Sequence, residues 1–191
     1  MLDIGTCFGQ EIRQLAANGA PTLNMYAVDL IPDFWELGYE LFRDRERMHA
    51  HFFVADILDG KSSDSLRVLK GRVDIINSAS LFHLFSWEKQ VKAMIQMAQL
   101  TSGPGALIAG HNVGREPAGV TENKWYKNNP PFLHNEDSFH RIWDEVGEAT
   151  SMKWEVEVLL GGNEIIGLEK GELAWMGPLA RTLRFTITRL A

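Results

Sequence analysis

The chain has 191 residues, of which 45% are hydrophobic and 23% charged, as is typical of one soluble globular domain with a buried core. Its formal net charge of −6 argues against a nucleic-acid-binding groove, because phosphate contacts need clustered lysine and arginine. No apolar run reaches the ~18 residues of a membrane span and no signal-peptide pattern stands at the start, so we expect a cytoplasmic location.

The chain opens with an apolar run, residues 2–4, that passes into a glycine turn, Gly5–Gly9. Residues 10–17 then have a helical pattern. This order predicts a strand, a tight turn and a helix, with glycines where the backbone approaches a ligand closely. Cys7 is the only cysteine, which excludes an internal disulfide and a cysteine-based zinc site, and we predict no metal site. We interpret Cys7 as a small turn residue, because nothing nearby would activate a nucleophilic thiol.

Two further apolar runs each end in an aspartate. Residues 25–28 precede Asp29, and a third strand over about 49–55 precedes Asp56. An acid at the tip of the second strand can accept hydrogen bonds from both hydroxyls of a nucleoside ribose. Three successive strand ends therefore carry a glycine turn or an acid, a combination more specific than the glycines alone.

A helix is predicted to follow the second strand, because Pro32 suits a first helical turn. Apolar residues at helical spacing predict one buried stripe, formed by Phe34, Leu37, Gly38 and Leu41. Trp35 and Tyr39 lie off that stripe.

The middle of the chain continues the alternation. A short helix is predicted near 64–70, and residues 72–77 form an apolar strand that we expect to be covered on both faces. A helix over 87–100, which Ser86 can cap, carries the apolar stripe Val91, Met94, Ile95 and Ala98. A fifth strand follows over 106–110. Five strands with helical connections predict an α/β fold with a parallel, doubly wound sheet.

The run 112–134 has no periodicity, and such long irregular connections are often functional. Asn135 can cap a helix that Gly147 ends, with a buried stripe formed by Phe139, Ile142, Trp143 and Val146. Two alternating runs, 154–158 and 183–187, predict the last strands.

The segments LDIGTCFGQ, YAVDL and FVADI resemble the first three motifs of class I S-adenosylmethionine (SAM)-dependent methyltransferases. The run CFGQ, the helix IPDFWELGYELFRD and a later tryptophan-rich region are similar to fungal methyltransferases of meroterpenoid and polyketide biosynthesis. The likeness covers most of the chain, with one departure: the usual G-x-G-x-G turn lacks its middle glycine. The resemblance implies one domain over residues 1–191, a Rossmann-like sheet that is mostly parallel and closes with an antiparallel C-terminal hairpin.

The resemblance also implies a SAM site at the carboxyl edge of the sheet. Asp3 and the glycine turn would lie near the methionyl end, Asp29 on the ribose and Asp56 on the adenine amine. The aliphatic residues after the two acids would pack on the adenine faces. The expected cofactor-binding residues are Asp3, Gly5, Gly9, Asp29, Leu30, Asp56, Ile57, Asn77 and Ser78. For each aspartate alone, a helix cap or turn residue is the alternative.

NAD is the competing cofactor. A dinucleotide site needs a three-glycine fingerprint and a pyrophosphate at a helix N-terminus. Here Phe8 fills a position that must stay small. The acid after the third strand also has a ready use on adenine, so SAM fits better.

Methyl transfer to a hydroxyl needs a general base, whereas a carboxylate is already ionised and needs none. His83 and His111 are the candidate bases, with a hydrogen-bonded structural histidine as the alternative for each. An apolar substrate pocket could be walled by four aromatic residues, with loop packing as the alternative. These residues are Trp125, Tyr126, Phe132 and Trp175.

We therefore predict a SAM-dependent methyltransferase acting on a carboxylate or hydroxyl oxygen of a small secondary metabolite, such as a terpenoid or polyketide. The alternative is a SAM-fold protein without methyltransfer activity, either a partner subunit or a non-methylating biosynthetic enzyme. The resemblance implies an N-terminal helical segment that covers one sheet face, and only Met1 precedes the first strand here. We expect a longer enzyme, or a homo-oligomer that covers the gap.

Overall fold

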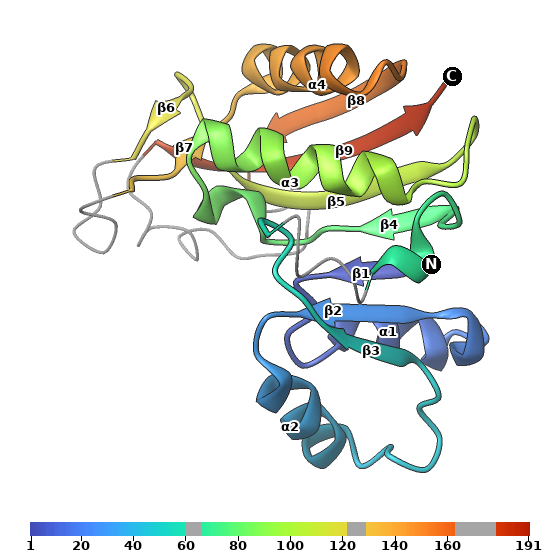
Figure 1. Cartoon of the computed structure of the whole chain (residues 1–191). Coiled ribbons are helices and arrows are strands. Elements are labelled where there is room, and N and C mark those ends of the chain that lie inside the picture. Colours follow the sequence, from blue (N-terminus) through green and yellow to red (C-terminus); the bar gives the residue numbers. More distant parts are fainter. Residues whose placement is uncertain (60–65, 122–128, 163–178) are drawn as a thin grey trace.

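Seven strands form one sheet in the order β3-β2-β1-β4-β5-β9-β8 (Figure 1). The structure, a computed structural model, describes residues 1–59, 66–121, 129–162 and 179–191. The strands of the sheet are β1 (Leu2–Ile4), β2 (Tyr26–Asp29), β3 (His51–Val54), β4 (Ile75–Asn77), β5 (Leu107–Arg115), β8 (Trp154–Gly161) and β9 (Ala180–Arg189). Strands β1 to β5 are parallel, and β9 lies antiparallel between β5 and β8. The predicted fold class is confirmed.

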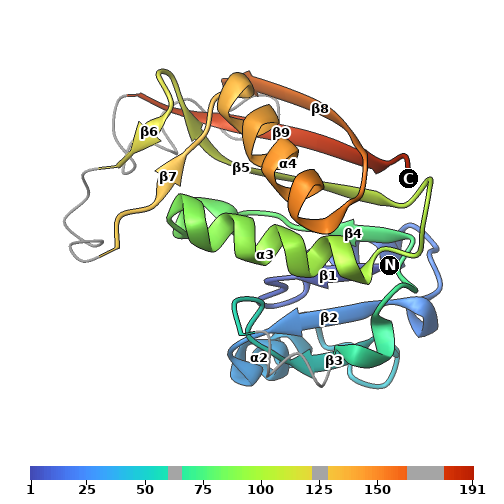
Figure 2. The ribbon, with the colours of Figure 1, turned by 45° about the horizontal axis from the view of Figure 1, so that its top comes forward.

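Helices cover the sheet from both sides. They are α1 (Gln10–Ala17), α2 (Pro32–Phe42), α3 (Trp87–Leu100) and α4 (Glu136–Thr150), with short 3-10 helices η1 (Thr22–Asn24), η3 (Arg67–Leu69) and η4 (Phe82–Leu84). Helices α3 and α4 lie side by side over one face, in front of β5 and β9 (Figures 1 and 2). Among the described residues, no helix is long and apolar enough to cross a membrane.

The two faces of the sheet carry cores of unequal size. Alternate residues of a strand point to opposite faces, so Leu2 and Ile4 join the large core under α3 and α4, together with Phe185 and Trp143. The opposite face, under α1 and α2, has a small separate core. Its buried members are Ile12, Met25, Ala27, Trp35 and Met48. The first three strands are therefore held on one side by a large shared core and on the other by a small one.

The buried stripe predicted for α2 is wrong. Leu37 and Leu41 are 46% and 65% exposed, whereas Trp35 is 2% exposed. Trp35 stacks on Phe52 of β3, with ring centroids 5.3 Å apart and an interplanar angle of 10°. The indole outcompetes the aliphatic stripe because an aromatic side chain buries a large area. Of the predicted stripe, only Gly38 is buried.

Most of the predictions for the buried stripes of α4 and α3 are confirmed. The four stripe residues of α4 are all buried, and the side chain of Asn135 caps the helix by accepting from the Ser138 backbone N–H. The expected end at Gly147 is wrong, because the helix continues to Thr150. In α3, Met94 and Ala98 are buried, and their stripe partners are partly buried against the same core.

The run 112–134 is more regular than predicted. Strand β5 continues to Arg115, paired with β9 from Leu107–Thr188 to Arg115–Ala180. Two short strands, β6 (Gly119–Val120) and β7 (Phe132–Leu133), then form a separate antiparallel sheet. The error arose because short strands carry too few residues for a period to show.

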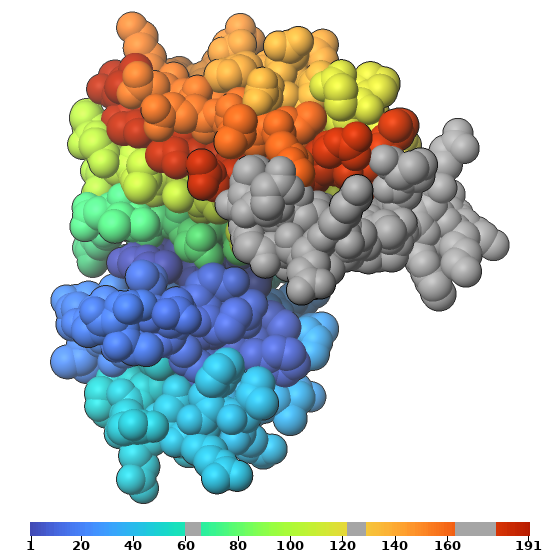
Figure 3. Space-filling model, turned by 180° about the vertical axis from the view of Figure 1, so that it is seen from behind, coloured from blue at the N-terminus to red at the C-terminus, as the bar shows by residue number. Residues whose placement is uncertain are grey.

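The sheet face opposite α3 and α4 is open over part of its width. The predicted cover on both faces is wrong for β4, because Ile75 is 46% exposed. Figure 3 shows this face, where strand residues of β4, β5, β9 and β8 form the surface beside α1. That a further segment or a second copy covers this face stays a prediction.

Replacing Gly38 by alanine should destabilise the fold. In an ordinary helix this change gains up to ~1 kcal/mol of helix propensity. Here the added Cβ would clash with the Phe8 carbonyl oxygen and lie 3.0 Å from Arg13 Nη1. Overpacking of this kind costs about 1–3 kcal/mol, which we expect to appear as a lower urea midpoint. Gly119→Ala is the control, since nothing lies within 4 Å of its added Cβ. A midpoint unchanged or raised in Gly38→Ala would contradict the packing described here.

Candidate functional site

The glycine turn between β1 and α1 is tightly wound. Gly5, Cys7 and Gly9 all have positive φ, of 75°, 49° and 70°. The Gly5 and Thr6 N–H groups donate to the carbonyl of Val28 in β2, at 2.9 and 3.1 Å. A side chain at Gly9 would lie 2.5 Å from the Trp35 ring. The turn therefore needs glycine at its last position both for its conformation and for its packing.

Cys7 occupies the place of the missing middle glycine. It adopts the left-handed conformation there, which costs a non-glycine residue roughly 1–2 kcal/mol. Its N–H donates to Asp29 Oδ2 at 2.8 Å, which helps to hold this conformation. Burial raises the pKa of the Cys7 thiol, so the side chain is protonated at neutral pH. This protonated state agrees with its interpretation as a turn residue.

Asp29, at the end of β2, faces the turn. While Oδ2 accepts from Cys7, Oδ1 accepts from the Ile31 N–H at 3.0 Å. Each carboxylate oxygen has two lone pairs, so both oxygens retain one for a ligand. Leu30 beside it is 62% exposed. The tip of β2 thus offers two acceptor sites and an uncovered aliphatic side chain.

Asp3 lies beneath the turn and is 2% exposed. Its carboxylate accepts from the Thr6 hydroxyl at 2.6 Å and from the Asn77 side-chain amide at 2.7 Å. Burial raises the pKa of Asp3 to about 6, against the lowering effect of these two hydrogen bonds; the nearby charges of Glu11 and Asp29 also raise it. The network joins β1, the turn and β4 at the point where the strand order reverses.

The remaining predicted cofactor-binding residues follow strands β3 and β4. Asp56 Oδ1 accepts from the Leu58 N–H at 2.8 Å, a turn beside β3. Ile57 is 7% exposed and belongs to the large core. Ser78, after β4, is fully buried, and its hydroxyl has no hydrogen-bond partner among the residues that the structure describes. The structure thus joins the turn, Asp29, Asp3 and Asn77 by hydrogen bonds. Asp56 and Ile57 follow β3, whose last residue, Val54, pairs with Asp29.

The two candidate histidines lie on neighbouring elements: His111 is within β5, and His83 is in η4, beside Asn112 of the same strand. His83, in η4, is buried, and its Nδ1 lies 3.2 Å from Asn112 Oδ1. Because an amide oxygen only accepts, Nδ1 carries the proton and Nε2 is the basic nitrogen. His111 Nε2 lies 3.4 Å from the Ser80 hydroxyl. Burial lowers the pKa of both histidines, and in His83 this effect outweighs the hydrogen bond to Asn112, which raises the pKa. Both rings are therefore neutral at pH 7.

Phe132 is the one expected pocket residue that the structure describes; Trp125, Tyr126 and Trp175 lie outside the described residues. The Phe132 ring packs edge-on against Trp87, at 5.1 Å, and lies 4.9 Å from the ring of His134. Gln90 donates to the Phe132 carbonyl at 2.8 Å. Phe132 is thus part of a packed aromatic cluster at the start of α3.

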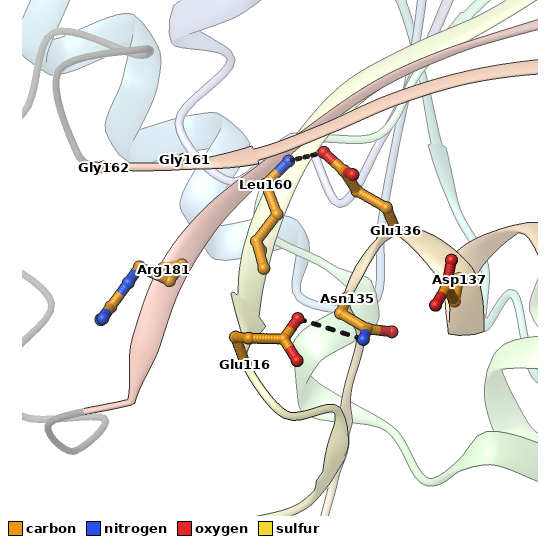
Figure 4. Close-up of a pocket in the computed structure, with 8 residues that line it drawn as sticks. All are labelled: Glu116, Asn135, Glu136, Asp137, Leu160, Gly161, Gly162 and Arg181. Atoms are coloured by element: carbon orange, nitrogen blue, oxygen red, sulfur yellow. Dashed lines mark hydrogen bonds between the residues drawn. The ribbon is translucent and has the colours of Figure 1, made fainter.

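Sequence patterns missed a polar cavity of about 470 Å³ near the start of α4 (Figure 4). It is lined by Glu116, Asn135, Glu136, Asp137, Leu160, Gly161, Gly162 and Arg181. Asn135 donates to Glu116 at 3.1 Å, and the Leu160 N–H donates to Glu136 at 2.9 Å. No motif or spacing joins these residues, because they come from α4, β8, β9 and the segment after β5, which are spread over a long stretch of the sequence. Within the described ranges, no three His, Cys, Asp or Glu side chains are placed to hold a metal ion.

Replacing Asp3 by asparagine should remove a pH dependence of stability. The pKa of Asp3 rises from 3.8 to about 6 on folding, so its contribution is full below 3.8 and is lost as pH rises through 6. As the pH rises from about 4 to 7, the wild type should therefore lose roughly 3 kcal/mol of unfolding free energy that the variant does not lose. Urea unfolding across this range measures the effect, with exposed Asp33→Asn as control. Parallel pH profiles for wild type and Asp3→Asn would contradict a raised pKa.

A family profile described as a methyltransferase domain matches residues 1–105. The chain is 38% identical to O-methyltransferase phiE of Fungal sp. (strain ATCC 74256), over 82% of this chain and 52% of the relative. It is 35% identical to O-methyltransferase atr3 of Stereocaulon alpinum, over 100% of this chain and 54% of the relative. The chain thus spans about half the length of these relatives.

Solved structures agree on the fold. The [4+2]-cyclase SpnF superposes with a TM-score of 0.67 at 13% identity, covering 100% of this chain and 75% of that one. Sequence similarity this low shows the fold alone. The family profile and the curated relatives carry the assignment further, and the chain belongs to the class I, SAM-dependent methyltransferases.

Proposed function

We propose that this chain binds SAM at the carboxyl edge of β1 to β4 and transfers its methyl group to an oxygen atom of a small secondary metabolite. The observation that carries the proposal is the hydrogen bond from the Cys7 N–H to Asp29. It joins a turn wound tightly enough to approach a ligand to a carboxylate that retains acceptor sites for two ribose hydroxyls.

The donor set fits an adenosyl cofactor. Asp29 would accept from the ribose hydroxyls, exposed Leu30 would cover one face of adenine, and Asp56 would accept from the adenine amine. Asp3 and its Asn77 partner would lie at the methionyl end, where an ionised carboxylate favours an ammonium group. Bound SAM supplies an electrophilic methyl group on a sulfonium. The remaining task of the protein is to hold the acceptor oxygen in line with it and to exclude water.

Oxygen as the acceptor is supported by the names of phiE and atr3, both O-methyltransferases. A carboxylate acceptor needs no proton removed. A hydroxyl acceptor would need a neutral base, and the buried His83 and half-buried His111 are neutral because burial lowers both pKa values. The aromatic side chains of Trp125, Tyr126, Phe132 and Trp175 remain the proposed walls of an apolar pocket for the substrate.

A protein of this fold without methyltransfer activity is the second candidate. The fold similarity to a [4+2]-cyclase supports it, because that neighbour's name states a different reaction on the same architecture. A methyl-transfer assay with isotopically labelled SAM and extracts of fungal aromatic and terpenoid acids separates the two. SAH binding without any labelled product would favour the second candidate.

Wild-type protein should bind SAM and S-adenosylhomocysteine (SAH), and not NAD, in isothermal titration. Asp29→Ala should weaken SAH binding by about 1–3 kcal/mol, the cost of leaving the ribose hydroxyls without their acceptor in the complex. Asp29→Asn should weaken it less, since an amide oxygen can still accept from the Cys7 N–H.

Asp33→Ala is the control for that measurement, because Asp33 is an exposed acid only four residues away. Unchanged SAH affinity in Asp29→Ala, or tighter binding of NAD than of SAM, would refute the cofactor site.

Replacing His83 or His111 by glutamine should distinguish the acceptor. With a carboxylate acceptor, each variant should keep turnover within about tenfold of wild type, because no general base acts. With a hydroxyl acceptor, one variant should lose ~100-fold or more while its SAH affinity stays unchanged. His140→Gln on the exposed side of α4 is the control. Loss of SAH binding in either variant would instead indicate a structural histidine.

A further inference from the structure

Arg13 is a buried arginine that the proposed function does not use. It lies in α1, is 6% exposed, and turns its guanidinium toward α2 and the loop after it. Nε and Nη2 donate to the two carboxylate oxygens of Asp44, at 2.8 and 3.1 Å. The remaining terminal nitrogen, Nη1, donates to the backbone carbonyl of Phe8. One side chain therefore joins α1, the loop at 44 and the glycine turn.

Three aromatic rings enclose this guanidinium. Its Cζ lies 4.9 Å from the ring of Trp35, 5.4 Å from Tyr39 and 4.9 Å from Phe42. Trp35 donates to the Tyr39 hydroxyl at 3.0 Å, so two of the rings are also fixed to each other. The flat, delocalised guanidinium can stack on these rings and bind both oxygens of the Asp44 carboxylate at once. The compact ammonium of lysine can do neither as well.

The bond to Phe8 holds one peptide unit of the turn at both ends. A peptide is planar, and the N–H of the unit that Phe8 and Gly9 share donates to the Thr6 carbonyl at 2.7 Å. With Arg13 on the carbonyl side, that unit cannot rotate. The close approach of Gly38 to the same carbonyl leaves it no room to move toward α2. The Phe8–Gly9 peptide thereby keeps one orientation within the turn.

We infer that Arg13 is a positioning residue for the cofactor: it touches no ligand, and sets SAM affinity by locking the Phe8–Gly9 peptide of the turn. The inference rests on the proposed role of that turn. The requirement is for guanidinium geometry, so lysine cannot replace arginine, and Asp44 contributes by orienting the guanidinium.

The test compares Arg13→Lys and Asp44→Asn with wild type by two measurements. Hydrogen–deuterium exchange of the ligand-free protein should be faster at residues 5–10 in both variants, by about tenfold in Arg13→Lys, and unchanged in α3. The SAH dissociation constant should rise at least about tenfold in Arg13→Lys and less in Asp44→Asn, since the bond to Phe8 remains.

Arg189→Lys is the matched control. Arg189 also donates to a backbone carbonyl, that of Thr101 at 3.2 Å, but it lies in β9, away from the turn. It should lower stability without changing exchange in the turn or SAH affinity. If Arg13→Lys fails to fold, Asp44→Asn carries the test.

The possible outcomes distinguish a failure of the inference about Arg13 from a failure of the proposed cofactor site. Unchanged exchange in the turn, or SAH affinity lost equally in Arg189→Lys, overturns the role of Arg13. Wild-type protein that binds no SAH refutes the cofactor site, while exchange in the turn still decides whether Arg13 orders it.

Discussion

The site depends on the hydrogen bond between the Cys7 N–H and the Asp29 carboxylate. Three residues of the turn have positive φ, and a chain without compensating contacts would not hold such a conformation. Two further N–H groups of the turn donate to Val28, the residue before Asp29. The turn is therefore built on the end of β2, and any ligand that uses both elements meets a preformed surface.

Polar groups at the centre of the sheet serve this surface at some cost to stability. Asp3 is buried with a raised pKa, and Ser78 buries a hydroxyl that has no partner in the described part of the chain. A purely structural strand end would place apolar side chains at both positions. The aromatic cluster at the start of α3 is the opposite case, because Gln90 and His134 satisfy each other and the backbone there.

The turn, the acids at the strand ends and the alternation of strands and helices could be predicted, because each follows from a local pattern that packing does not alter. The buried face of α2 could not, since the stacking of Trp35 on Phe52 joins residues from different elements. Arg13 was missed for the same reason. Its partners, Asp44 and the Phe8 carbonyl, lie 31 and 5 residues away in opposite directions along the chain. Periodicity describes one helix at a time, whereas these side chains belong to three elements at once.

The unequal cores have a consequence for how the molecule opens. Among the described residues, the small core has five buried hydrophobic members. We therefore expect α1 and α2 to open together at less than the global free energy of unfolding. A cofactor seated between the tips of β1 and β2 would bind only the closed form and shift that equilibrium. Cofactor occupancy and resistance to proteolysis of the N-terminal third would then rise together, and the protein's lifetime would depend on the cofactor supply.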